Sequence, residues 1–194
     1  MTSPLAPKTL LTFEDYLAYD DGTDTRYELV DGELVAMPPE SQRNNAIAKR
    51  LWAVLLQHVP LERLAYKDTE VEVMGHRARC RIPDLLVHSE ESLLAIQDKL
   101  RATLTHAMPP PALVVEVVSP GEANRSRDYR HKRTEYAARG IAEYWIVDPE
   151  TRQVTICQWV DGQYEDKVFQ GDAAIQSTVV PQIALTADQL FAHP

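Results

Sequence analysis

The stretch that decides the fold is PALVVEVVSP (residues 111–120), in which apolar residues surround one carboxylate, Glu116. A short run rich in β-branched residues and bounded by prolines predicts a buried strand over residues 112–119. A carboxylate with apolar neighbours on both sides is costly to bury unless it is paired, protonated or bound to a cation. Glu116 therefore belongs either to a buried ion pair or to a functional site.

A second carboxylate, Asp84, occurs in a similar setting. It follows a proline and precedes the apolar run 85–87, and we expect a strand over residues 77–87. Taken alone, a Pro-Asp pair most often marks a turn. Two carboxylates on neighbouring strands repel each other as ions, whereas a divalent cation between them removes the repulsion. Oxygen ligands of this kind suit Mg²⁺ or Mn²⁺.

Residues 126–139 supply a positive charge to this arrangement. Their spacing predicts a helix on which Lys132 falls on the same stripe as Tyr129 and Tyr136. Lysine is rarely directed into a protein core. The simpler interpretation pairs Lys132 with Asp128 four residues earlier, or lets its ammonium group reach solvent along the alkyl stem.

The remaining sequence predicts hairpins at both ends of an α/β core. Asp-Gly turns predict hairpins over residues 26–37 and 151–169. Periodicity and turn residues predict four further segments, which are helices over 41–58 and 90–101 and strands over 69–73 and 142–149. The core order is helix, strand, strand, strand, helix, strand, which indicates an α/β fold with a mixed central sheet. A chain of 194 residues is expected to form a single domain, 1–194.

Charge limits the partners of the protein. A net charge of −9 counts against a non-specific nucleic-acid binder, because phosphate contacts need lysine and arginine. A local basic surface is still compatible with this total. The candidates for contact with a phosphate backbone are Arg77, Arg79, Arg81, Arg125, Arg127 and Arg130. For any single one of them, a solvated basic face is an equally good interpretation.

Several other classes of protein find no support in the sequence. No apolar run approaches the roughly 20 residues of a membrane helix, and the N-terminus lacks the features of a secretory signal, so we expect no membrane partner and a cytoplasmic location. Cys80 and Cys157 fit neither a zinc knuckle nor a disulfide framework. The chain contains no GxxxxGK, HExxH or GxSxG motif.

Four segments taken in order resemble a known family. They are YELVDGELVAM (27–37), IPDLLV (82–87), LVVEVVSP (113–120) and DYRHKRTEYAARGIAEYWIVDP (128–149). In this order they are similar to the restriction-endonuclease family of the Uma-two type, a branch of the PD-(D/E)XK nuclease superfamily. The resemblance covers about residues 12–170 and implies one restriction-endonuclease-like domain.

The resemblance also implies roles for individual residues. Asp84 and Glu116 match the two acids that hold the metal in the superfamily, helped by a backbone carbonyl near Val117. The sequence departs from the general pattern at Val118, which stands where the superfamily has a lysine. In this family the charge is displaced onto the following helix, within Asp128-x-x-x-Lys132. Glu28 matches an upstream acid that the family carries, although a solvated hairpin glutamate is the simpler interpretation.

The expected function is therefore that of a Mg²⁺-dependent (or Mn²⁺-dependent) endodeoxyribonuclease. Its catalytic residues would be Asp84, Glu116 and Lys132, with DNA as the partner, and the edge of the terminal strands suits a homodimer. Two alternatives stay open at this point. One is a nuclease fold retained as a non-cleaving binding module, and the other is a hydrolase of small phosphodiesters, which the acidic net charge would not hinder.

Overall fold

The larger of two β-sheets forms the centre of the protein. The computed structural model describes residues 10–37, 39–74 and 78–192, and its larger sheet has six strands in mixed orientation. In spatial order they are β11 (Gln163–Gln170), β10 (Gln153–Val160), β9 (Glu143–Asp148), β8 (Leu113–Val117), β6 (Leu85–Val87) and β3 (Leu64–Tyr66). Strands β8 and β9 run parallel, and the other neighbours are antiparallel.

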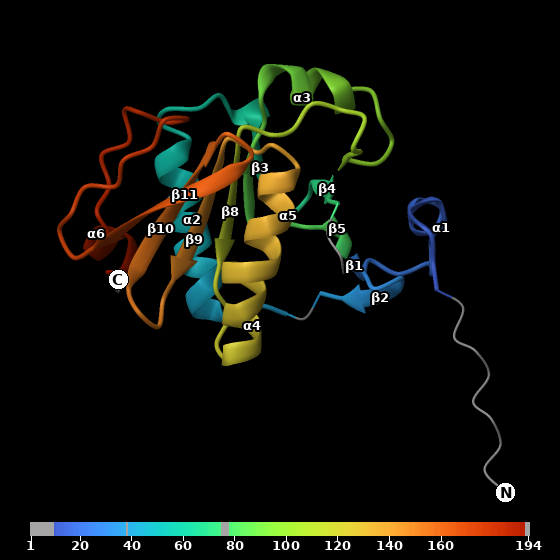
Figure 1. The fold of residues 1–194 in the computed structure, drawn as a ribbon, viewed down its shortest axis with the longest axis horizontal. Helices are drawn as coiled ribbons and strands as arrows, with labels where there is room; N and C mark the ends of the chain where they lie inside the picture. The colour runs from blue at the N-terminus through green and yellow to red at the C-terminus, as the bar shows by residue number, and fades with distance from the viewer. Residues whose placement is uncertain (1–9, 38, 75–77, 193–194) are drawn as a thin grey trace, which may run out of the picture.

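Helices cover both faces of strand β8 (Figure 1), and all of its side chains are buried. Successive side chains enter two different cores. Leu113 and Val115 pack in the core under helices α2 (Gln42–Leu55) and α6 (Ala187–Phe191). Val114 packs in the core under the opposite helix, with Tyr136 and Tyr144. Since successive side chains of a strand point to opposite faces, Glu116 lies on the same face as Val114. The expected buried strand with a central carboxylate is therefore confirmed.

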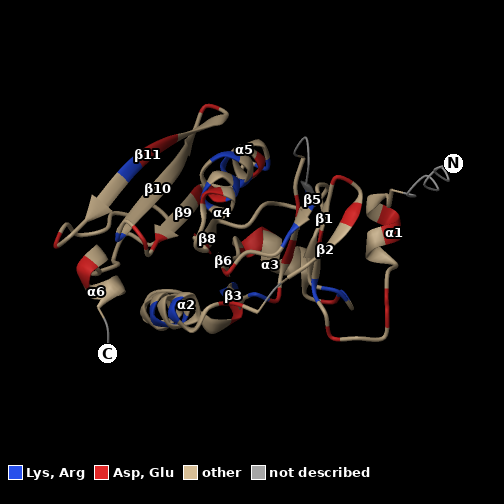
Figure 2. Ribbon diagram, turned by 90° about the horizontal axis from the view of Figure 1, so that it is seen from below, with Lys and Arg blue, Asp and Glu red and all other residues tan. Residues whose placement is uncertain are grey.

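The helix that follows β8 is interrupted by a π-helical segment. It consists of α4 (Glu122–Ser126), the π-helical segment η2 (Arg127–Lys132) and α5 (Arg133–Ala138). The ribbon runs continuously through these three parts across the face of the sheet opposite α2 (Figures 1 and 2). π-Helical turns inside α-helices are rare overall, but many of those that occur lie at functional sites.

The smaller sheet lies beside the β3 and β6 end of the larger one (Figure 1). Its strands, in spatial order, are β2 (Glu33–Ala36), β1 (Tyr27–Val30), β5 (Ala78–Arg81), β4 (Glu70–Glu72) and β7 (Thr103–Leu104). Three short helical elements complete the described fold, namely α1 (Phe13–Leu17), η1 (Leu61–Arg63) and α3 (Glu90–Ile96). No helix among the described residues is long and apolar enough to cross a membrane.

The expected core order of helix, strand, strand, strand, helix, strand is confirmed as α2, β3, β6, β8, the α4–α5 helix and β9. Both expected hairpins are confirmed as β1–β2 and β10–β11. The first strand of this order, however, is not the segment that was expected. The strand expected over 69–73 is β4 of the smaller sheet, whereas the first core strand is β3, which the sequence did not predict.

The single strand expected over 77–87 is in fact two strands in different sheets. β5 belongs to the smaller sheet and β6 to the larger one, and Ile82, Pro83 and Asp84 form the crossing between them. The physical reason is Pro83, because a proline has no backbone N–H to give to a sheet ladder. This crossing carries Asp84 to the boundary between the two sheets.

Arg81, at the end of β5, fastens the smaller sheet to helix α5. Its guanidinium bonds Glu28 of β1 at 2.9 Å and Glu135 of α5 at 2.8 and 3.2 Å. The side chain of Arg81 is only 3% exposed, whereas that of Arg79 is 47% exposed and pairs with Glu72 at 3.0 Å. Arg81 therefore does not lie on a basic surface, which corrects its expected contact with a phosphate backbone. Both carboxylates that it bonds are also buried.

We predict that Arg81→Met destabilises the protein by about 3–5 kcal/mol, because it leaves two carboxylates buried without their shared cation. Arg79→Met, two residues away on the same strand, should cost about 0–1 kcal/mol, because the Arg79 side chain is 47% exposed and Glu72 keeps the hydrogen bond from the backbone N–H of His106. Urea denaturation followed by circular dichroism gives both free energies of unfolding. Equal losses for the two variants would contradict a structural role specific to Arg81.

Candidate active site

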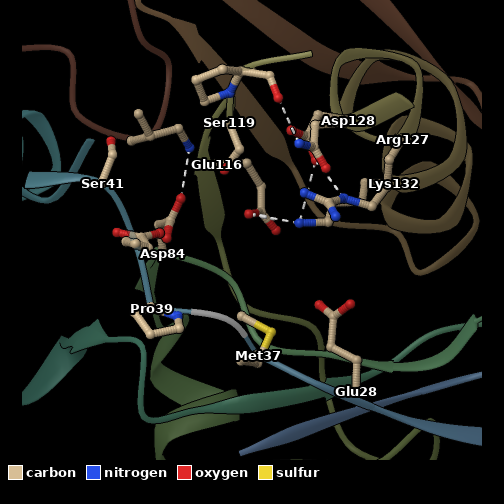
Figure 3. Close-up of a pocket in the computed structure, with 14 residues that line it drawn as sticks. Glu28, Met37, Pro39, Ser41, Asp84, Glu116, Ser119, Arg127, Asp128 and Lys132 are labelled. Carbon is tan, nitrogen blue, oxygen red and sulfur yellow. Dashed lines mark hydrogen bonds and ion pairs between the residues drawn. The ribbon is translucent and has the colours of Figure 1, made fainter. Parts of the chain in front are cut away.

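A cleft lies beside the carboxyl end of β8, between the α4–α5 helix and the start of α2 (Figure 3). Its volume is about 260 Å³. Five acidic and two basic side chains line it, namely Glu28, Glu40, Asp84, Glu116, Asp128, Arg127 and Lys132. The three residues expected to be catalytic, Asp84, Glu116 and Lys132, therefore lie on one cleft although they come from three separate parts of the chain.

Glu116 is held by two partners from the helix above the sheet. One carboxylate oxygen, Oε1, accepts a hydrogen bond of 2.8 Å from the hydroxyl of Tyr136. The other, Oε2, lies 2.8 Å from the ammonium nitrogen of Lys132. The side chains of Glu116 and Lys132 are each 5% exposed, so the pair sits at the base of the cleft rather than on its rim.

Asp84 lies opposite Glu116 and is tied to the same strand. Its Oδ2 accepts a hydrogen bond of 2.7 Å from the backbone N–H of Val117. Its Oδ1 lies 3.4 Å from the ammonium nitrogen of Lys67. Lys67 also forms an ion pair with Glu40, so these two carboxylates share one lysine. The main chain of Val117 therefore lies between the two expected metal-binding acids.

The π-helical segment η2 places Asp128 and Lys132 side by side. Oδ1 of Asp128 lies 3.4 Å from the ammonium nitrogen of Lys132 and 3.4 Å from Nε of Arg127. The backbone carbonyl of Asp128 accepts a hydrogen bond of 3.1 Å from the hydroxyl of Tyr144 in β9. Lys132 therefore bonds both Asp128 and Glu116, which combines the simpler interpretation of this lysine with the functional one.

Glu28 lines the cleft from the smaller sheet, and it is buried rather than solvated. Burial alone would raise the pKa of Glu28, but the charges of Lys132 and Arg81 outweigh burial and lower this pKa. Glu28 therefore stays ionised and faces the same lysine as Glu116. The expectation of a solvated hairpin glutamate was wrong, because Arg81 of the neighbouring strand covers it.

The two central carboxyl groups are poorly accommodated as anions. Burial raises the pKa of Asp84 to about 7, with a further increase from the hydrogen bond and charge of Glu40. Burial likewise raises the pKa of Glu116 to about 7, although Lys132 opposes this shift and the charges of Asp84 and Asp128 add to it. Near neutral pH both carboxyl groups are therefore partly protonated, and a metal cation would compete with the protons for the carboxylate oxygens.

Lys132 has the opposite tendency. Burial would lower its pKa, but the neighbouring carboxylates of Glu116 and Asp128 raise it well above the usual value for lysine. Lys132 therefore carries its positive charge throughout the neutral range. It can hold or offset negative charge in the cleft, whereas a general base would need a lowered pKa.

The donor set fits a hard divalent cation. Carboxylate oxygens of Asp84 and Glu116 and the carbonyl of Val117 are the kind of ligand that Mg²⁺ and Mn²⁺ prefer. Among the residues that the structure describes, no group of three or more histidine, cysteine, aspartate or glutamate side chains is arranged to hold a metal. Mg²⁺ sites commonly use only one or two carboxylates and keep several waters, so the residues present fit such an ion.

The arginines expected to contact phosphate differ in their surroundings. Arg125 pairs with Asp148, Arg127 pairs with Asp128 at the cleft, and Arg130 is exposed. Arg77 lies outside the described residues. Lysine and arginine positions gather on α2 as well as on the α4–α5 helix (Figure 2). The predicted basic surface is thus partly neutralised by acids of the chain itself.

Sequence reasoning missed three residues close to the expected metal ligands. Glu40 and Lys67 contact each other and lie against Asp84, and Asn44 donates from Nδ2 to the carbonyls of Val117 and Val118 at 3.5 and 3.1 Å. Glu40 and Lys67 lie outside regular elements, so no periodicity could have found them. Asn44 is a polar residue on the buried face of an amphipathic helix, which is a signal of the same kind as Glu116.

The fold and the cleft define a nuclease-like α/β protein, and the comparisons with known proteins agree. The model of the Uma2 family, described as "Putative restriction endonuclease", matches residues 13–188, and the chain belongs to this family. A solved structure of a putative nuclease belonging to DUF820 from Anabaena variabilis is similar, with a TM-score of 0.66 and 17% identity. The match covers 93% of this chain and 97% of that one. Comparison with curated proteins gave no match.

These findings confirm the resemblance noted in the sequence and the restriction-endonuclease-like fold. The chain is therefore a member of a nuclease family, and an enzyme of the hydrolase class is the function that the family indicates. A structural likeness at 17% identity concerns the fold alone.

The raised pKa of Asp84 generates a prediction about stability. In the unfolded chain an aspartate loses its proton near pH 4, whereas folded Asp84 keeps it up to about pH 7. Between these values the folded state binds more protons, so the free energy of unfolding falls as pH rises. Asp84→Asn cannot ionise, and its stability should fall less between about pH 5 and about pH 8, by on the order of 2 kcal/mol.

The measurement is urea denaturation of both proteins at the two pH values, with a chelator present throughout. Asp98→Asn, which alters an exposed acid outside the cleft, serves as the matched control and should follow the native pH dependence. If the native protein and Asp84→Asn lose stability in parallel, the pKa of Asp84 is not raised in the folded protein.

Proposed function

We propose that the protein is a metal-dependent DNA endonuclease. The observation that carries this proposal is the meeting of Asp84, Glu116 and Lys132 on one cleft, with the lysine ammonium 2.8 Å from Glu116. Membership of a nuclease family supports hydrolysis of a phosphodiester. We further propose that the substrate is DNA and that the metal is Mg²⁺ or Mn²⁺.

The residues that would hold the metal are Asp84, Glu116 and the backbone carbonyl of Val117. A divalent cation bound there would lower the pKa of a bound water and act as a Lewis acid toward the phosphate. The chain supports this assignment in two ways. Both carboxyl groups have a raised pKa in the absence of a cation, and the acids that line the cleft outnumber the bases, so a phosphodiester would be repelled until a cation offset that charge.

Lys132 is proposed to supply the fixed positive charge of the site. Its contacts with Glu116 and Asp128 fix the ammonium at the base of the cleft, where it would offset charge that develops on the phosphate in the transition state. Its raised pKa favours this role over that of a general base. Tyr136 holds the other oxygen of Glu116 and so keeps this carboxylate turned toward the lysine.

The proposal also explains the valine in the superfamily's lysine position. Val118 is 3% exposed and belongs, with Tyr136, to the core under the helix. A lysine at this place would have to displace that packing. Lys132 reaches the same carboxylate from the helix instead, so the charge is kept while its source changes from the strand to the helix.

DNA is proposed as the substrate and partner, with Arg127, which lines the cleft, and exposed Arg130 of the same helical segment as the basic residues that would meet its backbone. The proposal further includes a cytoplasmic location and a homodimer. Strand β11 ends the larger sheet and exposes Val168, so its free edge is the surface at which a second copy would pair.

Metal binding is the first test of this function. We expect isothermal titration with Mn²⁺ to show one site that Asp84→Asn and Glu116→Gln each lose, because each variant removes one of the two charged ligands. Glu122→Gln, in which an exposed acid of α4 is neutralised, should bind as the native protein does. Unchanged binding by Asp84→Asn and Glu116→Gln would rule out the proposed ligands.

Cleavage is the second test. We expect the native protein to nick plasmid DNA in Mg²⁺ or Mn²⁺, and Lys132→Met to lower the rate by about 10²–10³-fold, because a preorganised charge is removed from the reacting centre. Lys99→Met, which removes an exposed charge outside the cleft, should leave the rate unchanged. Circular dichroism would check that Lys132→Met is folded.

The two alternative functions give different results in these assays. A non-cleaving binding module would bind no Mn²⁺ at Asp84 and Glu116. A hydrolase of small phosphodiesters would turn over a chromogenic diester such as bis-nitrophenyl phosphate and leave plasmid and single-stranded DNA intact.

A further inference from the structure

Lys67 is a charged residue of the site that no element of the catalytic proposal uses. It directly follows β3, and its backbone φ of 55° lies in the left-handed region. A long side chain rarely adopts this conformation outside a tight turn, and such residues concentrate at functional sites. The unusual backbone directs the side chain toward Asp84 and Glu40.

The ammonium group of Lys67 would compete with a metal ion for the carboxylate of Asp84. It lies 3.4 Å from Oδ1 of Asp84 and also bonds Glu40, and its side chain is 20% exposed. A divalent cation that takes Asp84 would repel this ammonium and would weaken the carboxylate charge that holds it. Binding of a metal to Asp84 therefore weakens the contact between Asp84 and Lys67, and this contact in turn weakens metal binding.

A second cavity provides a place for the displaced lysine. Its volume is about 260 Å³, and it shares Met37 and Glu40 with the catalytic cleft. Arg26 and Lys67 are its two basic lining residues. Arg26 is exposed, and its side chain takes part in no ion pair among the residues 10–37, 39–74 and 78–192.

The charge of this second cavity depends on Lys67. While Glu40 and Asp84 hold the ammonium, its charge is neutralised, and of the described bases that line the cavity only Arg26 is left without an ion pair. A cation bound at Asp84 takes that carboxylate from Lys67 and also attracts Glu40, which lines the same cleft, so both contacts of the ammonium weaken and Lys67 becomes available beside Arg26. Two cations in a cavity that opens beside a phosphodiester-cleaving site form a binding place for a second phosphate of the same strand.

We propose that Lys67 is a substrate-binding residue controlled by the metal. Without metal it neutralises Asp84 and Glu40, and with metal it turns to the second cavity, where together with Arg26 it binds the phosphate next to the one that is cut. This inference rests on the proposed function. It adds a phosphate subsite and a reason why DNA would bind firmly only after the metal.

The experiment measures how DNA affinity depends on salt, since each lost phosphate contact lowers the slope of log K against log salt by about one. A fluorescent DNA duplex of mixed sequence is titrated with native protein and with Lys67→Met, each in Mn²⁺ and in a chelator, and gels verify that the duplex stays intact. We expect Lys67→Met to lower the slope by about one in Mn²⁺ and to leave it unchanged in the chelator.

Two further variants calibrate this assay. Arg26→Met should lower the slope in both conditions, because Arg26 is available with or without metal. Lys99→Met, which removes an exposed charge outside both cavities, should change neither. In calorimetry, Lys67→Met should bind Mn²⁺ several-fold more tightly than the native protein, because the competing ammonium is gone.

Each contrary result has a separate meaning. An equal slope for native protein and Lys67→Met in Mn²⁺ makes Lys67 a structural counter-ion and overturns the inference while leaving the endonuclease proposal intact. A lower slope in both conditions overturns control by the metal. If Lys67→Met binds Mn²⁺ no more tightly, the competition is absent. If native protein binds neither Mn²⁺ nor DNA, the proposed function fails, and this inference fails with it.

Discussion

The contact on which the rest of the site depends is the ion pair between Glu116 and Lys132. A carboxylate in the middle of a strand covered on both faces has no water to solvate it, so it needs a cation from the same protein or from solution. Lys132 meets that need at 2.8 Å but is itself buried. It therefore brings a second requirement for negative charge, which Asp128 and Glu28 help to satisfy. One buried charge thus determines the identity of several neighbours on the helix and on the smaller sheet.

The cleft exists because two sheets meet at it. Glu116 belongs to the larger sheet, Glu28 belongs to the smaller one, and Asp84 stands on the crossing between them. Arg81 connects the smaller sheet to helix α5 through two buried carboxylates. The separation of the acids across the cleft is therefore set by the packing of one sheet against the other rather than by any single element.

Much of the core and the three central residues could be predicted from the sequence because each has a local signal. Glu116 interrupts an apolar run, Asp84 begins another, and Lys132 falls on an aromatic stripe of its helix. The failures also have local causes. Strand β3 has three residues, too few for a periodic pattern. Alternation showed that Arg79 and Arg81 share a face, but it could not show that helix α5 covers only one of them.

The neighbours of Asp84 were beyond prediction for a different reason. Glu40 and Lys67 come from irregular segments that are far apart in sequence. Their meeting depends on how the loop before α2 and the bend after β3 fold over the crossing at Asp84. Charge pairing of this kind arises from tertiary packing and leaves no mark in the spacing of residues along the chain.

The π-helical segment has a consequence for the comparison of related chains. A π turn accommodates an extra residue within a helix, so the parts before and after it are rotated by about 100° relative to a regular α-helix. An alignment without a gap in residues 127–132 would align only one of the two helices α4 and α5 correctly. In the other helix, each residue would be matched to a residue on a different face. A family member that lacks the π turn should therefore be aligned with a one-residue gap inside the helix, where gaps are normally forbidden.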